Sequence, residues 1–294
     1  MEYHNSNLQV LQKNVYLIWN NSNLGDLING TITTFKICKT YNYNLIIDMS
    51  NSDISNFLRN GKSPLCIYPY INFESKSYNT ENIPFFKIEE KMNLENYIHN
   101  YFLDNSDNVC HITTSAFPYE EIKDDEKQLI KDLLFPNDLI YSLIEYQYSV
   151  LPPTILLDPE CGDNMLKKYT SVYYNIGDEK GITDNVRYDK FLFYLNKIET
   201  SFHLSYKNSI VLFSDSYEFK KFAQTENRNI SFTNNKLNNE ICDFYLMSKS
   251  KSITFLYEKM LYKEEHIVYM PYCHFAYLCS KIYDIPLHTV RLDN

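Results

Sequence analysis

Residues 15–49 read VYLIWNNSNLGDLINGTITTFKICKTYNYNLIIDM, and the order of apolar and polar residues in this stretch indicates the fold. An apolar run at 15–19 leads into a polar turn, after which apolar residues recur at helical spacing from Leu24 to Ile37. A second apolar run follows at 45–49. Two short apolar runs on either side of a helical pattern predict a βαβ unit with parallel strands.

The same alternation continues along the chain. The first half adds an expected strand at 109–114 and expected helices at 124–135 and 138–150, after which Pro152-Pro153 interrupts the pattern. In the second half we expect strands at 171–176, 210–214, 230–232, 252–255 and 267–269, and helices at about 188–202, 217–224, 240–249, 256–264 and 275–282. The sequence therefore predicts an α/β fold with two facing Rossmann-like domains, which we place at residues 1–160 and 161–294.

Composition excludes several classes of protein. Of 294 residues, 44% are hydrophobic and 22% charged, with only 6 Gly and 10 Pro, which excludes low-complexity and wholly disordered chains. The net charge of −9 gives no broad basic field, so we expect no nucleic-acid partner. No basic region followed by an apolar run opens the chain, and no stretch approaches the ~18 apolar residues of a membrane span. We therefore expect a cytoplasmic protein without a membrane span.

Metal-ligand patterns are absent from the sequence. The seven Cys include no CxxC pair, and neither an Asp-x-Asp motif nor a His/Cys cluster has the spacing of metal ligands. We therefore expect no metal and no resident cofactor.

Three turns combine an expected strand end with small or acidic residues, and the first follows the strand at 15–19. There, Gly25 would let the backbone turn tightly or approach a ligand, and Asp26 would lie in the first helical turn behind Asn23. An ordinary helix start, with Gly25 for the turn and Asp26 as a cap, explains the same residues equally well.

The second turn, residues 173–181, follows the first strand of the second half. It contains Gly177 and the adjacent carboxylates Asp178 and Glu179. A carboxylate in this position can act as a base or accept a hydrogen bond from a hydroxyl. A solvated polar turn is the alternative interpretation.

The third turn ends the apolar strand at 210–214. It consists of two hydroxyls and an acid, Ser214, Asp215 and Ser216, and a further acid, Asp243, opens a later helical segment. Ligands of open α/β sheets bind beyond the carboxyl ends of the strands, so these residues are candidates for a binding site.

Taken in order, five segments resemble motifs of the fucosyltransferase superfamily, the metal-independent enzymes that include α-1,2-, α-1,6- and protein O-fucosyltransferases. Residues 23–26 are similar to the family's N-terminal Gly-x-Gly-Asp/Asn segment, and residues 134–137, Leu-Phe-Pro-Asn, to its Leu-Pro-Ser/Asn element. Residues 173–178 stand where the family has His-x-Arg-x-Gly-Asp, residues 213–216 where it has Phe-Ser-Asp-Asp, and residues 243–248 where it has Asp-x-x-Leu-Met-Ser.

The resemblance implies a GT-B-like fold in which residues 1–160 form the acceptor side and residues 161–294 bind the donor. It implies an inverting transferase that uses GDP-fucose, or a related nucleotide sugar, and a glycan or other hydroxyl acceptor. The catalytic base would be Asp26, Asp178 or Glu179. The implied donor-binding residues are Asn23, Gly25, Asn175, Gly177, Arg187, Ser214, Asp215, Ser216 and Asp243.

Several positions depart from the family pattern and leave alternatives open. Tyr173 replaces the family's His, and residues 252–255 keep at most a trace of its Asn-Ser-Thr/Ser-Phe element. Asn175 stands in place of the family's diphosphate-binding Arg, whose bidentate fork an amide cannot reproduce, and Ser216 in place of the second acid of Ser-Asp-Asp.

In an active enzyme another group must then bind the diphosphate. Arg187 is the first candidate, and Lys180, Lys190 and the helix N-termini after Gly177 and Ser214 are the other candidates. The alternatives are a transferase for another nucleotide sugar, or a degenerate family member that binds ligands or acts as a scaffold.

Overall fold

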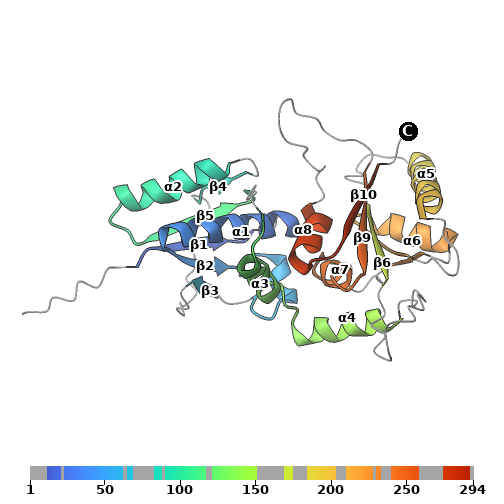
Figure 1. The fold of residues 1–294 in the computed structure, drawn as a ribbon, viewed down its shortest axis with the longest axis horizontal. Coiled ribbons are helices and arrows are strands. Elements are labelled where there is room, and N and C mark those ends of the chain that lie inside the picture. Colours follow the sequence, from blue (N-terminus) through green and yellow to red (C-terminus); the bar gives the residue numbers. More distant parts are fainter. Residues whose placement is uncertain are drawn as a thin grey trace, which may run out of the picture. The chain divides into compact units, whose positions relative to one another are not determined.

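The computed structural model describes residues 12–20, 23–61, 65–68, 83–87, 90–116, 121–150, 169–174, 184–202, 210–227, 230–232, 240–257 and 274–291. Contacts between residues divide the chain into two compact units, Met1–Asn137 and Asp138–Asn294. Each unit contains one five-stranded sheet (Figure 1).

The sheet of the first unit has the strand order β3-β2-β1-β5-β4. Strand β1 pairs in parallel with β2 and with β5, β4 is parallel to β5, and β3 is antiparallel to β2. The strands are β1 (Asn14–Ile18), β2 (Asn44–Asp48), β3 (Leu65–Tyr68), β4 (Phe85–Phe86) and β5 (Val109–Thr114). The helices are α1 (Leu24–Tyr41), the 3-10 helix η1 (Asp53–Phe57), α2 (Lys91–Asp104) and α3 (Asp124–Leu133).

Helix α1 connects β1 to β2 and packs against β1, β2 and β5. Asn23 caps its N-terminus, and its C-terminus ends at Asn42 in the left-handed conformation, with φ of 56°. All five residues of β1 and of β2 are buried, as expected for central strands of a parallel sheet. The βαβ unit predicted from residues 15–49 is thus confirmed.

The sheet of the second unit is parallel throughout, with the strand order β10-β9-β6-β7-β8. Its strands are β6 (Thr170–Tyr174), β7 (Ile210–Ser214), β8 (Ile230–Phe232), β9 (Ser252–Tyr257) and β10 (Leu287–Arg291). Its helices are α4 (Asp138–Val150), α5 (Asp184–Phe202), α6 (Tyr217–Glu226), α7 (Glu240–Met247) and α8 (His274–Tyr283). Figure 1 shows α5 and α6 on one side of this sheet and α7 and α8 on the other.

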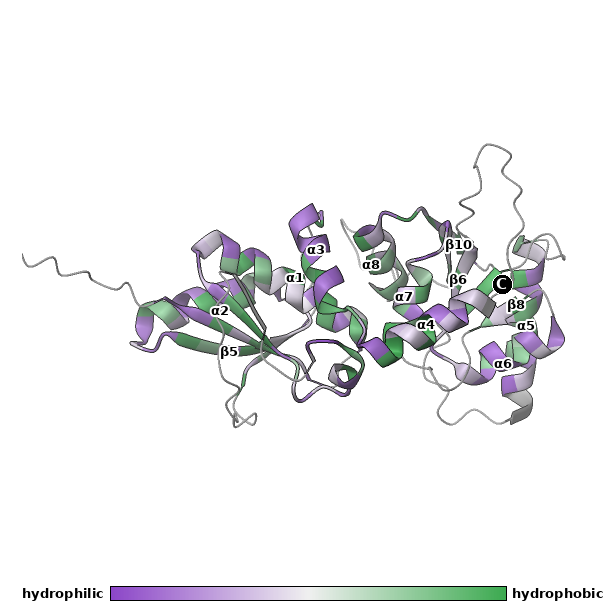
Figure 2. Cartoon of the chain, turned by 90° about the horizontal axis from the view of Figure 1, so that it is seen from below, coloured by the Kyte–Doolittle hydropathy of each residue, from purple (hydrophilic) through white to green (hydrophobic). Residues whose placement is uncertain are grey.

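The core of the second unit explains why its strands and helices form where apolar residues recur. Phe219 of α6, Phe191 of α5 and Leu212 of β7 belong to one buried cluster on the α5–α6 side of the sheet. Helices such as α3 and α6 alternate between hydrophilic and hydrophobic residues along the ribbon (Figure 2), as expected for helices with one buried face. The α/β class and the two Rossmann-like units are therefore confirmed.

Several elements differ from the sequence expectations. The strands β3, β4 and β10 and helix α2 had not been predicted, and β9 extends to Tyr257, where a helix was expected to begin at residue 256. Strands β3, β4 and β10 are edge strands of their sheets. Edge strands are often short, and β10 is mostly exposed, so none of the three has a long apolar run. The strand expected at 267–269 lies outside the described residues.

Helix α4 belongs to the second unit, whereas the sequence placed it within residues 1–160. It packs against α7, where the rings of Tyr141 and Tyr245 lie 6.0 Å apart, and just after α7 Lys249 pairs with Glu145. These partners lie about a hundred residues further along the chain, so local sequence patterns could not assign the helix to its unit.

Candidate functional site

The carboxyl edge of the second sheet is where the fold predicts a ligand. All five strands are parallel, so their carboxyl ends lie at one edge, and the strand order reverses between β6 and β9. Ligands of such sheets bind at this reversal, beyond the carboxyl ends. Tyr174 at the end of β6 pairs in register with Ser214 at the end of β7, so the two strands end at the same level of this edge.

The turn after β7 is shaped by its own hydroxyls. Ser214 Oγ donates a hydrogen bond to Asp215 Oδ1 (3.2 Å) and accepts one from the backbone N–H of Ser216 (3.2 Å). Ser216 caps α6, because its Oγ accepts from the backbone N–H of Phe219 (3.1 Å). The two serines are buried, whereas Asp215 is exposed at this edge.

Asp243 forms a buried ion pair that the sequence analysis did not anticipate. Lys220 Nζ of α6 lies 3.2 Å from Asp243 Oδ2 of α7. The Lys220 side chain is 0% exposed and that of Asp243 is 11% exposed. One signal was available: Lys220 lies on the buried face of α6 between Phe219 and Ala223, a position where a helix normally carries an apolar residue.

The remaining donor-side candidates are only partly described. Arg187 is half-buried and lies in the first turns of α5. Because α5 connects the parallel strands β6 and β7, it begins on the side of their carboxyl ends. Asn175, Gly177, Asp178 and Glu179 lie outside the described residues. The structure therefore places Ser214, Asp215 and Ser216 at the carboxyl edge of the second sheet, and the contact with Lys220 joins Asp243 to the helix that starts there.

The three candidates of the first unit form the start of α1. Asn23 Oδ1 accepts from the backbone N–H of Asp26 (2.9 Å), and Asn23 Nδ2 donates to Asp26 Oδ2 (2.8 Å). Asn23, rather than Asp26, is the capping residue, and Asp26 adds a favourable negative charge to the first turn. Gly25 is buried beside them. These contacts show that Asn23 and Asp26 stabilise the N-terminus of α1.

Polar groups also gather where α1 crosses the carboxyl ends of β1 and β5. Trp19 Nε1 donates to Thr31 Oγ1 (3.1 Å), and Thr33 Oγ1 donates to the carbonyl of Ala116 (2.6 Å). Asn29 is 0% exposed, and among the described residues neither its amide nitrogen nor its amide oxygen has a hydrogen-bond partner.

In β5, burial lowers the pKa of His111, and the charge of Asp48 opposes this shift.

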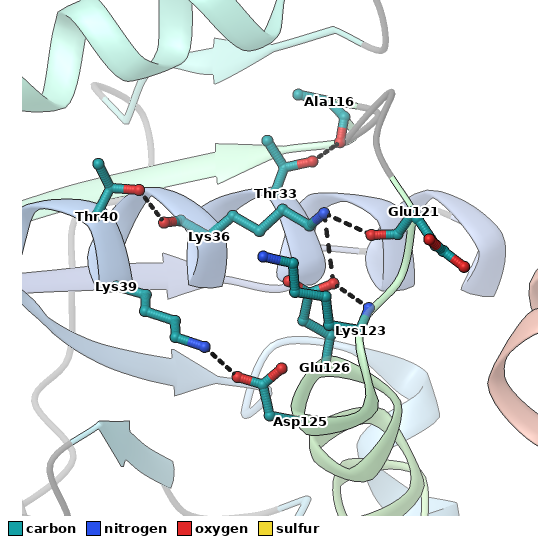
Figure 3. Close-up of polar contacts among 9 residues, drawn as sticks. All are labelled: Thr33, Lys36, Lys39, Thr40, Ala116, Glu121, Lys123, Asp125 and Glu126. Atoms are coloured by element: carbon teal, nitrogen blue, oxygen red, sulfur yellow. Dashed lines mark hydrogen bonds and ion pairs between the residues drawn. The ribbon is translucent and has the colours of Figure 1, made fainter.

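A charged cluster between α1 and α3 is structural (Figure 3). Lys36 Nζ donates to the carbonyl of Glu121 (2.9 Å) and lies 3.4 Å from Glu126 Oε2, which also accepts from the backbone N–H of Lys123 (2.9 Å). Lys39 pairs with Asp125, and this hydrogen bond lowers the pKa of the Asp125 carboxyl group. The cluster fixes the first turn of α3 against α1, so its charges are used within the fold.

Within the described ranges, no three His, Cys, Asp or Glu side chains come together as a group that could hold a metal ion. Likewise, no helix in the described part of the chain is both long and apolar enough to cross a lipid bilayer.

Comparisons with known proteins identify the fold. No family model matches the sequence, and no curated protein matches it significantly. Among solved structures, the fucosyltransferase NodZ from Bradyrhizobium is similar, with 11% identity over 91% of this chain and 92% of that chain and a TM-score of 0.53. A structure of the α-1,6-fucosyltransferase NodZ soaked with GDP-fucose gives 12% identity over 92% of both chains, with a TM-score of 0.53.

A variant of FUT1 from Arabidopsis thaliana in complex with GDP gives 11% identity over 96% of this chain and 71% of that chain, with a TM-score of 0.54. The chain therefore has the GT-B fold of the fucosyltransferases, and the fold implied by the sequence resemblance is confirmed. At this low identity the likeness concerns the fold, and the activity must be argued from the site.

Proposed function

We propose that the chain is an inverting glycosyltransferase that moves fucose from GDP-fucose to a hydroxyl of a glycan or another acceptor. The observation that carries this proposal is a carboxylate in the first turn of α7, Asp243, in a unit of a fucosyltransferase fold, paired with Lys220 of the helix that starts behind the Ser214–Ser216 turn. Two of the similar proteins have been solved with GDP-fucose or GDP, which supports a nucleotide sugar as the donor. A carboxylate in that position can accept hydrogen bonds from the base or ribose of a nucleotide.

The donor would bind the second unit, and the acceptor the first. In the second unit the candidate residues lie at helix N-termini: the Ser214–Ser216 turn before α6, Asp243 in α7 and Arg187 in α5. Backbone N–H groups and the helix dipole favour phosphate at such N-termini. Gly177 would let the diphosphate approach the backbone after β6. In the first unit, Asn23, Gly25 and Asp26 would contribute from the start of α1.

The reaction would be a single displacement. The acceptor oxygen forms a bond to C1 of fucose while the bond from C1 to the β-phosphate oxygen breaks, and the electron pair leaves on GDP. The acceptor proton passes to a carboxylate, for which Asp26, Asp178 and Glu179 are the candidates. Asp26 Oδ2 already accepts a hydrogen bond from Asn23, so Asp26 could act only if this bond were exchanged for the acceptor hydroxyl.

Nucleotide selectivity tests the proposed donor. We expect isothermal titration calorimetry to show tighter binding of GDP than of UDP. Tighter binding of UDP would favour a transferase for another nucleotide sugar. Binding of neither nucleotide at millimolar concentration would favour a degenerate protein that has kept the fold and lost transfer.

A second test concerns the cation that would replace the family's arginine. Removing a charged hydrogen bond to the diphosphate costs about 1.5–3 kcal/mol, so Arg187→Ala should weaken GDP binding about tenfold to a hundredfold without unfolding the protein. Lys197→Ala is the matched control, because it removes a cation from the same helix about 15 Å further along its axis. We expect this control to bind GDP as the wild type does.

Asn175→Arg tests the same interaction in the opposite direction, by returning the family's guanidinium to its position. We expect tighter GDP binding by calorimetry, because the planar fork can contact the diphosphate in a bidentate manner. If neither Arg187→Ala nor Asn175→Arg changes the affinity, this edge of the sheet binds no diphosphate and the transferase assignment must be abandoned.

A further inference from the structure

The Lys220–Asp243 pair connects two helices on opposite faces of the second sheet. Figure 1 shows α6 on one side and α7 on the other, and each helix follows a strand that ends at the carboxyl edge. Lys220 and Asp243 both lie in the first half of their helices. The 3.2 Å contact between them therefore joins the two helix layers on the side of the sheet where the fold places its ligand.

Burial is unequal between the two partners. The Lys220 side chain is completely buried, whereas 11% of the Asp243 side chain is exposed. The aspartate side chain therefore keeps some solvent contact, whereas the lysine side chain has none. Lys220 can therefore influence a ligand through the carboxylate that it contacts.

The chemistry of the pair explains why a lysine is useful there. Burial favours the neutral form of a carboxyl group, and a protonated carboxyl group donates as well as accepts hydrogen bonds. An ammonium group beside it keeps the carboxylate ionised, so that it only accepts, and holds one oxygen in a fixed position. Asp243 Oδ2 is the oxygen held here.

We propose that Lys220 is a positioning residue of the nucleotide site: it holds the Asp243 carboxylate at the carboxyl edge in a fixed, acceptor-only state. The ligand group that this carboxylate recognises is an N–H or O–H donor of a nucleoside diphosphate. This inference rests on the proposed function, and it adds a residue for which neither the sequence motifs nor the comparisons gave a role.

The experiment is a double-mutant cycle on GDP affinity, measured by calorimetry on the full chain. We expect Lys220→Met to weaken GDP binding on the order of tenfold, the lower end of what loss of a charged hydrogen bond produces. Lys220→Gln should weaken it less, because the amide can still donate to the carboxylate. Lys221→Met removes the neighbouring exposed charge from the same helix and should leave the affinity unchanged.

The cycle separates a positioning role from a purely structural one. If Lys220 acts through Asp243, the double variant Lys220→Met/Asp243→Asn should bind GDP as weakly as Asp243→Asn alone. Urea unfolding of each variant establishes that folded protein is being titrated. If Lys220→Met does not fold, Lys220→Gln replaces it in the same cycle.

Two results would overturn the inference. Equal GDP affinity of the wild type and the folded Lys220 variants would show that the lysine only stabilises the fold, and the proposed function would then stand without it. Additive losses in the double variant would show that Lys220 does not act through Asp243. If the wild-type chain binds neither GDP nor UDP, the proposed function fails, and this inference fails with it.

Discussion

Asp243→Leu is expected to lower the free energy of unfolding of the second unit by about 3–5 kcal/mol, because it leaves the Lys220 ammonium group buried without its negative partner. The Lys220 side chain is 0% exposed, so it cannot recover its hydration without opening the packing between α6 and the sheet. Urea unfolding followed by circular dichroism measures the loss.

The matched double variant tests whether the cause is the stranded charge. Lys220→Met/Asp243→Leu removes both charges and keeps two apolar side chains of similar size, and such replacements of buried ion pairs are often neutral or stabilising. We expect it to recover most of the stability lost in Asp243→Leu. A single variant within about 1 kcal/mol of the wild type, where ordinary surface substitutions fall, would mean that the buried pair does not form.

Gly30→Ala should destabilise the first unit by about 3 kcal/mol or more, at or above the usual range for overpacking. A Cβ atom at residue 30 would lie 2.0 Å from the carbonyl oxygen of Thr114 and 2.9 Å from its carbonyl carbon. Both are backbone atoms at the end of β5, so no side chain can rotate away, and α1 must move off the sheet. Urea unfolding again provides the measurement.

Helix propensity alone would make Gly30→Ala stabilising, because alanine is favoured over glycine inside a helix by about 1 kcal/mol. A loss of stability therefore points to the close contact with β5. Thr40→Ala, at an exposed position of the same helix, should stay within about 0.5 kcal/mol of the wild type. A Gly30→Ala protein as stable as the wild type would show that α1 does not approach β5 as closely as the structure has it.

The sequence alone determined the α/β class, because parallel strands and their connecting helices leave local patterns. Residues 15–49 show this directly: β1 and β2 each contain a run of apolar residues, and α1 between them has helical spacing. The sequence could not reveal β4 or β10, since a two-residue strand and a mostly exposed edge strand have no distinctive pattern. It also placed α4 in the first domain, because contacts with α7 are not local.

For the candidate site, the sequence determined which turns end the strands and carry hydroxyls and acids, as Ser214 and Ser216 illustrate. The helical spacing of Phe219 and Ala223 puts Lys220 rather than Lys221 on the apolar face of this segment, but it does not show which charge lies opposite the lysine. The tertiary structure buries Lys220 and leaves Lys221 exposed. The physical reason is that burial of a lysine requires a compensating charge, and this charge comes from Asp243, 23 residues away on another helix.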